Sequence, residues 1–171
     1  DIRIAYRRNE SNIGGLRLAD HWNLLLSLCD TEYVIVASDD DIYSPFFLEE
    51  IDKLTNKYPD VNVLRARTQR INDSNDRTAQ EDIFDEYQGR VAALHSMFCG
   101  NYIGCVGNYV FRKESLRRAG GFADLPYAWF SDMQTVISMQ DKGQVNTKQI
   151  LFSFRLSDIN ISSSKRDKKV D

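Results

Sequence analysis

Three consecutive carboxylates follow closely on a short apolar segment of the chain. The apolar segment covers residues 33–37, and Asp39, Asp40 and Asp41 come one residue later. Because adjacent carboxylates repel one another, we expect a compensating positive charge beside them. Mg²⁺ or Mn²⁺ would supply it, since these hard cations prefer oxygen ligands and often bind one or two carboxylates together with substrate phosphates. The plain alternative is an acidic turn that begins a helix, where the carboxylates interact with the helix dipole.

The segments on either side of these carboxylates predict a strand, a helix and a second strand. Residues 33–37 are β-branched and continuously apolar, which is typical of a parallel strand buried on both faces. Ser44 and Pro45 suit the N-cap and the first position of a helix, and residues 61–66 form a further apolar segment. In an open α/β sheet, ligands bind at the carboxyl ends of the strands, which is where the three carboxylates would lie.

The remaining segments were assigned from the spacing of their apolar residues. Alternation predicts strands, and spacings of three and four predict helices. Together they indicate one α/β domain over residues 1–160, followed by a polar tail over residues 161–171. We expect strands at 2–6, 108–112 and 145–154, helices at 18–29, 82–99, 113–119 and 133–140, and a polar surface loop at 67–80.

Composition narrows the classes of protein to which the chain can belong. With 22 Lys and Arg against 25 Asp and Glu, its net charge of −3 gives no general affinity for nucleic acid. No apolar run approaches the roughly 18 residues that a membrane-spanning helix requires. The three cysteines are odd in number and lack a metal-ligand spacing, which favours reduced thiols and a cytoplasmic location.

Two segments in the first third of the chain resemble the GT-A glycosyltransferases, in particular the inverting family 2. Residues 36–45, which contain the three carboxylates, are similar to the Asp-x-Asp region of that family. Asn12, Gly14, Arg17 and Asn23, followed by that acidic strand end, are similar to its central segment.

Two later segments continue the resemblance in the same order. Residues 111–122 resemble the family's Arg-containing helix, which ends in Gly-Gly-Phe. About ten residues further on the family has an acidic pair at a helix start, and here Ser131 and Asp132 occupy that place. The motifs span residues 12–140 and are more specific together than any one of them alone.

The resemblance implies a GT-A fold, which is a Rossmann-like α/β architecture with a mainly parallel central sheet. It implies the transfer, with inversion, of a sugar from a nucleotide-diphosphate sugar to a hydroxyl of a carbohydrate or lipid-linked acceptor. The reaction would depend on a divalent cation, Mn²⁺ or Mg²⁺. A lipid-linked acceptor would place the protein at the inner face of the membrane as a peripheral protein.

The family motifs also imply roles for individual residues. Asp40 would bind the metal ion with Asp41 in support, and Asp39 would contact the ribose or assist the metal. Asp132 would be the catalytic base, and its plain alternative is a helix-cap residue. The residues expected to bind the nucleotide-sugar cofactor are Asn12, Gly14, Arg17 and Asp39.

One departure from the family concerns the start of the chain. The family opens with a strand and an acidic loop that hold the nucleotide base, and these elements would precede residue 1. We therefore expect an N-terminally truncated domain, with its first strands missing and an exposed sheet edge. Such an edge favours pairing with another chain, so self-association is also expected.

Two other functions and several ambiguous residues remain open from the sequence. The chain could be a non-catalytic GT-A-like relative or an interaction module that retains the fold. A metal-dependent phosphohydrolase is less favoured, because no second cluster of ligands suits a two-metal site. Trp129 either stacks on a sugar or packs at a helix start, and His21 and His95 are expected to be structural or exposed. Three basic residues either meet phosphate or alternate along a strand edge: Arg65, Arg67 and Arg70.

Overall fold

The computed structural model describes residues 4–10, 13 and 17–156. Two of the predicted cofactor-binding residues, Asn12 and Gly14, lie outside these residues, as does the predicted tail. The strand expected at 2–6 is not present in the part of it that is described, residues 4–6.

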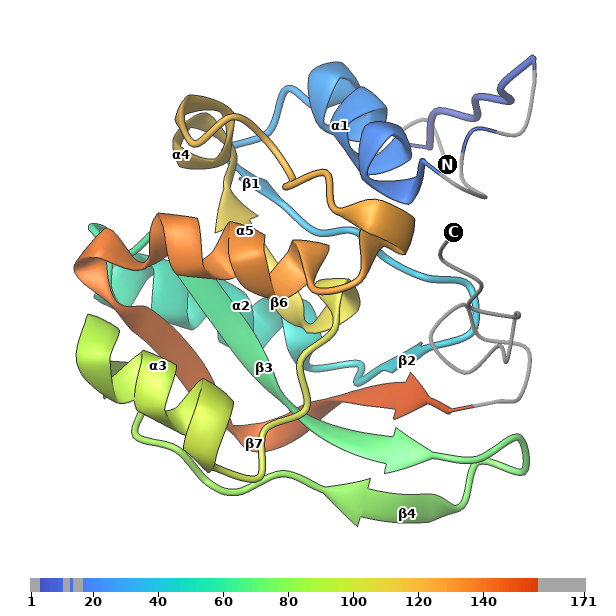
Figure 1. Cartoon of the computed structure of the whole chain (residues 1–171). Helices are drawn as coiled ribbons and strands as arrows, with labels where there is room; N and C mark the ends of the chain where they lie inside the picture. The colour runs from blue at the N-terminus through green and yellow to red at the C-terminus, as the bar shows by residue number, and fades with distance from the viewer. Residues whose placement is uncertain (1–3, 11–12, 14–16, 157–171) are drawn as a thin grey trace, which may run out of the picture.

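A sheet of seven strands forms the centre of the molecule (Figure 1). Its main strand order is β1-β6-β3-β7-β2, with β4 paired to β3 and β5 paired to β7. The strands are β1 (Tyr33–Val34), β2 (Ile42–Tyr43), β3 (Val63–Ile71), β4 (Arg77–Gln80), β5 (Tyr87–Gln88), β6 (Tyr109–Arg112) and β7 (Gln144–Arg155).

The sheet is mixed and mostly antiparallel, so the prediction of a mainly parallel sheet was wrong. Only β3 and β7 pair in parallel, whereas the other five pairings among the described strands are antiparallel. The prediction failed because a continuous apolar segment reports burial on both faces and says nothing about the direction of the neighbouring strand. β6 follows the 3₁₀ turn Val106–Asn108 and runs back between β1 and β3, which reverses the pairing on that side.

Five helices cover the sheet. In Figure 1, α3 and α5 lie on the near face, α2 lies on the far face, and α1 and α4 lie at the top, next to β1. The bounds are α1 (Leu18–Leu28), α2 (Phe47–Lys57), α3 (Arg90–Cys99), α4 (Lys113–Arg118) and α5 (Ser131–Met139), with further 3₁₀ turns at Pro126–Ala128 and Gln140–Lys142.

Three further expected elements differ in the structure. The strand expected at 33–37 is confined to β1, Tyr33–Val34. The segment 67–80, predicted as a loop, forms the end of β3, a turn and β4. Its side chains are polar because this hairpin extends to the end of the sheet, where most β4 side chains are exposed. The helix expected at 82–99 begins only at Arg90, because Tyr87 and Gln88 pair with β7 as β5.

Alternating side chains of β3 supply both halves of the core. Val63 packs with residues of α1, α3, α4 and α5, and the next residue, Leu64, packs with residues of α2 on the opposite face. β6 repeats this pattern, with Phe111 in the first cluster and Val110 in the second. Since successive strand residues point to opposite faces, the sheet holds helices on both sides. The segments at the strand ends are thereby fixed in place.

The described residues contain no helix that is long and apolar enough to cross a membrane. All three cysteines are free thiols, as the sequence predicted. β1 stands at one end of the strand order, and in the described part of the chain it pairs with β6 alone. The predicted self-association through this edge stays a prediction.

Candidate active site

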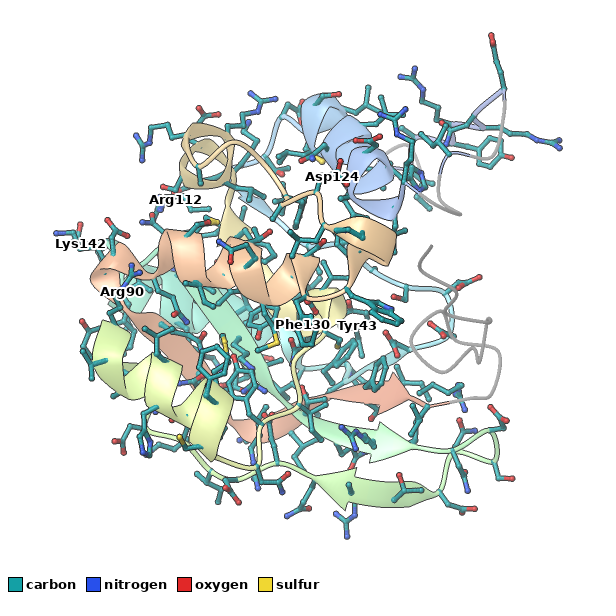
Figure 2. All side chains as sticks on the ribbon, viewed as in Figure 1. Tyr43, Arg90, Arg112, Asp124, Phe130 and Lys142 are labelled. Carbon is teal, nitrogen blue, oxygen red and sulfur yellow. The ribbon has the colours of Figure 1, made fainter. Side chains whose placement is uncertain are left out.

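A groove of about 840 Å³ brings the predicted catalytic and metal-binding carboxylates together. Asp39, Asp40 and Asp41, here called the aspartate triplet, line it together with Asp132. Its other walls come from α1, from the loop 104–107 and from the segment 128–130. Phe130, labelled in Figure 2, marks the last of these walls at the start of α5.

The aspartate triplet lies in the segment between β1 and β2, and its members differ in exposure. Asp39 and Asp40 are exposed, whereas Asp41 is half-buried. Burial raises the pKa of Asp41, although the backbone N–H of Arg155 donates to its carboxylate at 2.9 Å and acts in the opposite direction. One oxygen of Asp41 is therefore engaged in holding the segment, while the carboxylates of Asp39 and Asp40 are open to solvent.

Arg155, the last residue of β7, fixes the triplet to the turn between β3 and β4. Its Nε donates to the carbonyl oxygen of Asp40 at 2.8 Å. Its two terminal nitrogens donate to the carbonyl of Asn72 at 2.7 Å and to the side-chain oxygen of Asn75 at 2.6 Å. Because one planar guanidinium spans both segments, the position of the triplet depends on β7.

Asp132 is the second residue of α5, and it is half-buried at the groove. Burial raises its pKa, while the backbone N–H of Met133, which donates to Oδ1 at 2.8 Å, acts against this rise. A carboxyl group whose pKa is moved toward neutrality is better suited to accept a proton than an ordinary exposed one. Asp132 lines the same groove as the aspartate triplet. Its catalytic role stays a prediction.

Cys105 shows that the two sets of carboxylates converge. This thiol lies in the loop 104–107, and burial raises its pKa. The charges of Asp41 and Asp132 raise it further. Cys105 lines the same groove as Asp41 and Asp132.

The turn before Asp132 has a strained backbone. Ala128 and Phe130 have positive φ angles of 56° and 60°, a left-handed conformation that costs a residue with a Cβ atom about 1–2 kcal/mol. Residues held in this way often belong to functional sites. Here the strained turn forms the wall of the groove that contains Trp129 and Phe130.

Ser131 explains why the family's first acidic position is not acidic here. Its side chain is completely buried, and its hydroxyl accepts a hydrogen bond from the backbone N–H of Leu125 at 3.3 Å. A carboxylate in this place would be buried without a counter-charge among these contacts, which is costly. Ser131 therefore stabilises the strained turn, and of these two residues only Asp132 supplies a carboxyl group to the groove.

Asn23 links α1 to the Gly-Gly-Phe motif. Its side-chain nitrogen donates to the carbonyl of Phe122 at 3.0 Å, and its side-chain oxygen accepts from the N–H of Phe122 at 2.8 Å. Gly121 has a φ angle of 84°, and a Cβ atom there would collide with Asn23. Trp22 packs edge-on against Phe122, with 5.5 Å between ring centroids. These contacts fix the α1 wall of the groove relative to the segment that leads to Asp132.

A buried ion pair holds the residue directly before the loop 104–107. Arg65 and Glu81 both have fully buried side chains, and Arg65 Nη1 donates to Glu81 at 3.0 Å. Glu81 also accepts from the N–H of Ile103 at 3.1 Å, and Arg65 donates to the carbonyl of Ile103 at 2.9 Å. The guanidinium lies 3.7 Å from the ring centroid of Tyr102. Ile103, directly before the loop, is thus held through both of its backbone groups.

The structure resolves the ambiguity of two of the three arginines. Arg65 belongs to the ion pair, so it is neither a phosphate ligand nor an edge residue. Arg67 donates to three backbone carbonyls, those of Glu81, Asp82 and Lys148. Both reach their partners through long-range contacts that no local pattern in the sequence could indicate.

Some predicted residues are not brought to the groove, and some lining residues were missed. Arg17 pairs with Asp20 at the start of α1 and does not line the groove. His21 does line it, although the sequence indicated only a structural or exposed residue. The loop 104–107 was also missed, since its Gly-rich composition carries no specific signal. Among the described residues, no group of three or more His, Cys, Asp or Glu side chains is arranged to hold a metal ion by itself.

Comparison with known proteins gives a fold but no family. No protein-family model matches the sequence, and no curated protein matches it either. Among solved structures, S. aureus TarS 1-349 in complex with UDP-GlcNAc is similar, with a TM-score of 0.70 and 14% identity over 92% of this chain and 44% of that one. The complex of TarS 1-349 with UDP has a TM-score of 0.65 and 15% identity over 88% of this chain and 43% of that one.

The likeness shows that this chain has the fold of the matched part of TarS 1-349. The chain spans less than half the length of TarS 1-349. At this level of identity the comparison establishes the arrangement of the elements, and the chemistry has to be argued from the groove.

Proposed function

We propose that the chain forms the catalytic part of an inverting, metal-dependent glycosyltransferase that uses a nucleotide-diphosphate sugar as donor. The observation that carries the proposal is the groove itself, where the aspartate triplet and Asp132 meet although they are about ninety residues apart in sequence. The fold similarity to TarS, which was solved with UDP-GlcNAc and with UDP, supports the choice of donor class.

The charge of the groove supports a divalent cation as cofactor. Its described lining residues include four carboxyl groups and neither Lys nor Arg. A nucleotide diphosphate beside these carboxylates would be repelled by their charge, and a cation between them would offset the repulsion. Asp39 and Asp40 fit this need, because they are exposed oxygen ligands and Mg²⁺ or Mn²⁺ takes few protein ligands when phosphates supply the rest. When bound, the cation would stabilise the negative charge of the departing diphosphate.

The residues of this chain have distinct tasks in the proposed reaction. Asp39 and Asp40 hold the cation, with Asp41 and Arg155 keeping their segment in place. Asp132 lies in the same groove and accepts the proton of the acceptor hydroxyl as that oxygen attacks the anomeric carbon. Since attack occurs on the face opposite the departing diphosphate, the configuration at this carbon is inverted. General-base assistance of this kind contributes about 10² to 10⁴ in rate.

The test is release of nucleoside diphosphate from a panel of donors by the full-length protein. UDP-GlcNAc, UDP-glucose, UDP-galactose and GDP-mannose would each be supplied with Mn²⁺ and a mixture of sugar acceptors. We expect release from one donor, its loss in EDTA, and a decrease of at least about a hundredfold in Asp40→Ala. Asp52→Ala, an exposed carboxylate of α2 outside the groove lining, is the matched control and should retain the parent rate. Release that is unaffected by EDTA and by Asp40→Ala would refute the metal assignment.

A further inference from the structure

We propose that Trp129 and Phe130 form the acceptor subsite of the groove and that this subsite takes an uncharged sugar ring. This inference rests on the proposed glycosyltransferase function. It adds the class of acceptor, which neither the fold nor the catalytic carboxylates specify.

The two rings lie beside the proposed catalytic base. Trp129 and Phe130 come directly before the two residues that begin α5, and both line the groove that contains Asp132. Trp129 is 36% exposed and Phe130 is 69% exposed. Large aromatic side chains left this open within a groove are typical of ligand-binding surfaces. An acceptor in contact with these rings would have its hydroxyl groups close to the carboxylate that is proposed to deprotonate one of them.

The backbone of this wall has a left-handed conformation at two residues. The left-handed conformations of Ala128 and Phe130 are stabilised by contacts of the following helix turn, including the buried Ser131 hydroxyl. Thr135 adds a further contact, since its hydroxyl accepts from the N–H of Ala123 at 2.9 Å. The segment before α5 is therefore tied to the first turns of that helix, and both rings line the groove from this segment.

The lining of the groove combines apolar side chains with carboxylates. The neighbouring wall, on α1, contributes Leu18, Trp22 and Leu25, and His21 is the one ionisable residue among its lining residues. A sugar ring is amphipathic in a matching way, because its C–H face packs on an aromatic ring and its hydroxyls bind carboxylates. By contrast, an acceptor with its own phosphate or carboxylate would meet the four carboxyl groups, with neither Lys nor Arg among the described lining residues to compensate.

The experiment compares the KM values for donor and acceptor in the full-length protein. Acceptors would be the methyl glycosides of glucose, galactose, mannose and N-acetylglucosamine, each paired with its 6-phosphate. In Trp129→Ala we expect the KM for the neutral acceptor to rise about tenfold, the effect of losing one ring contact, with the donor KM unchanged. Trp129→Phe should recover most of this loss, and Phe98→Ala, an exposed aromatic of α3 outside the groove, should have no effect.

A second variant guards against a folding defect. Phe130→Asn removes the ring but keeps a residue that tolerates the left-handed backbone, so the turn should be retained. We expect its acceptor KM to rise as well, with a thermal unfolding midpoint close to that of the parent. If both variants keep the parent KM for neutral acceptors, or if the 6-phosphates are used as well as the neutral glycosides, the inference is overturned. If the parent protein itself releases no diphosphate from any donor with water or sugar, the proposed function fails, and this inference fails with it.

Discussion

Replacing Glu81 with Gln should destabilise the fold severely, because it leaves a buried guanidinium without its counter-charge. Both oxygens of Glu81 are used: each accepts from Arg65, and the N–H groups of Thr68 and Ile103 donate to them at 2.7 Å and 3.1 Å. In Gln an amide nitrogen replaces one of the two carboxylate oxygens. This nitrogen cannot accept a hydrogen bond, so the groups that donate to that oxygen in the parent lose their acceptor. Removing one member of a buried pair costs about 3–5 kcal/mol.

That loss is large beside the total stability of a domain, which is about 5–15 kcal/mol. For a chain of this size it corresponds to a decrease of roughly 6–20 °C in the unfolding midpoint. The assay is urea unfolding followed by Trp fluorescence, with thermal unfolding as a second measurement. Glu86→Gln is the matched control, since Glu86 pairs with Lys57 at the surface and should contribute less than about 1 kcal/mol.

A double variant tests the reason for the loss. In Arg65→Met with Glu81→Gln both charges are removed together, while the Gln oxygen can still accept from a backbone N–H group, so no unpaired guanidinium is left buried. We therefore expect the double variant to be more stable than Glu81→Gln. The reasoning would be refuted if Glu81→Gln unfolded within about 1 kcal/mol of the parent, or if the double variant were the less stable of the two.

Three further outcomes follow from the site. Asp132→Asn should raise the unfolding midpoint at neutral pH, because burial raises the folded-state pKa of Asp132 and its ionisation therefore costs stability as pH rises above the ordinary carboxyl range. Thermal unfolding across pH should show that this gain disappears in acid, and a constant gain at every pH would contradict the prediction. Arg155→Ala should weaken donor binding about tenfold, because the aspartate triplet loses its attachment to the β3–β4 turn. Calorimetry with Mn²⁺ measures this affinity, and an unchanged value would show that the triplet keeps its position without Arg155. Gly121→Ala should destabilise the fold by more than about 1 kcal/mol in urea, because the positive φ and the contact with Asn23 leave no room for a methyl group, and a loss within experimental error would contradict that geometry.

The helices and most strands could be predicted from local patterns, whereas the sheet could not. The apolar spacing of α2 and the aromatic and β-branched residues of β6 report local structure, and both elements form, although α2 begins at Phe47, two residues after the expected Pro45. Strand direction depends on the path of the chain between strands, and residues 33–37 look the same beside a parallel or an antiparallel neighbour. The predicted pairing of the sheet was therefore wrong, although the sequence predicted strands at β1, β3, β6 and β7.

The candidate site was also predicted only in part. The aspartate triplet and Asp132 were identified from motifs, and the groove brings them together. The residues that hold them could not be identified, because their contacts join distant parts of the chain. Arg155 contacts a segment 114 positions earlier, and Asn23 contacts one 99 positions later. Neither residue type nor spacing indicates such partners.

The most direct test of the proposed function compares binding with transfer in Asp132→Asn. Donor affinity would be measured by calorimetry with Mn²⁺, and transfer by the formation of glycosylated product from the donor that the parent protein uses. We expect the variant to bind the donor as the parent does and to lose transfer by at least about a hundredfold, since only proton removal from the acceptor is impaired. Transfer near the parent rate would show that Asp132 is a helix-cap residue and that the groove does not work as proposed.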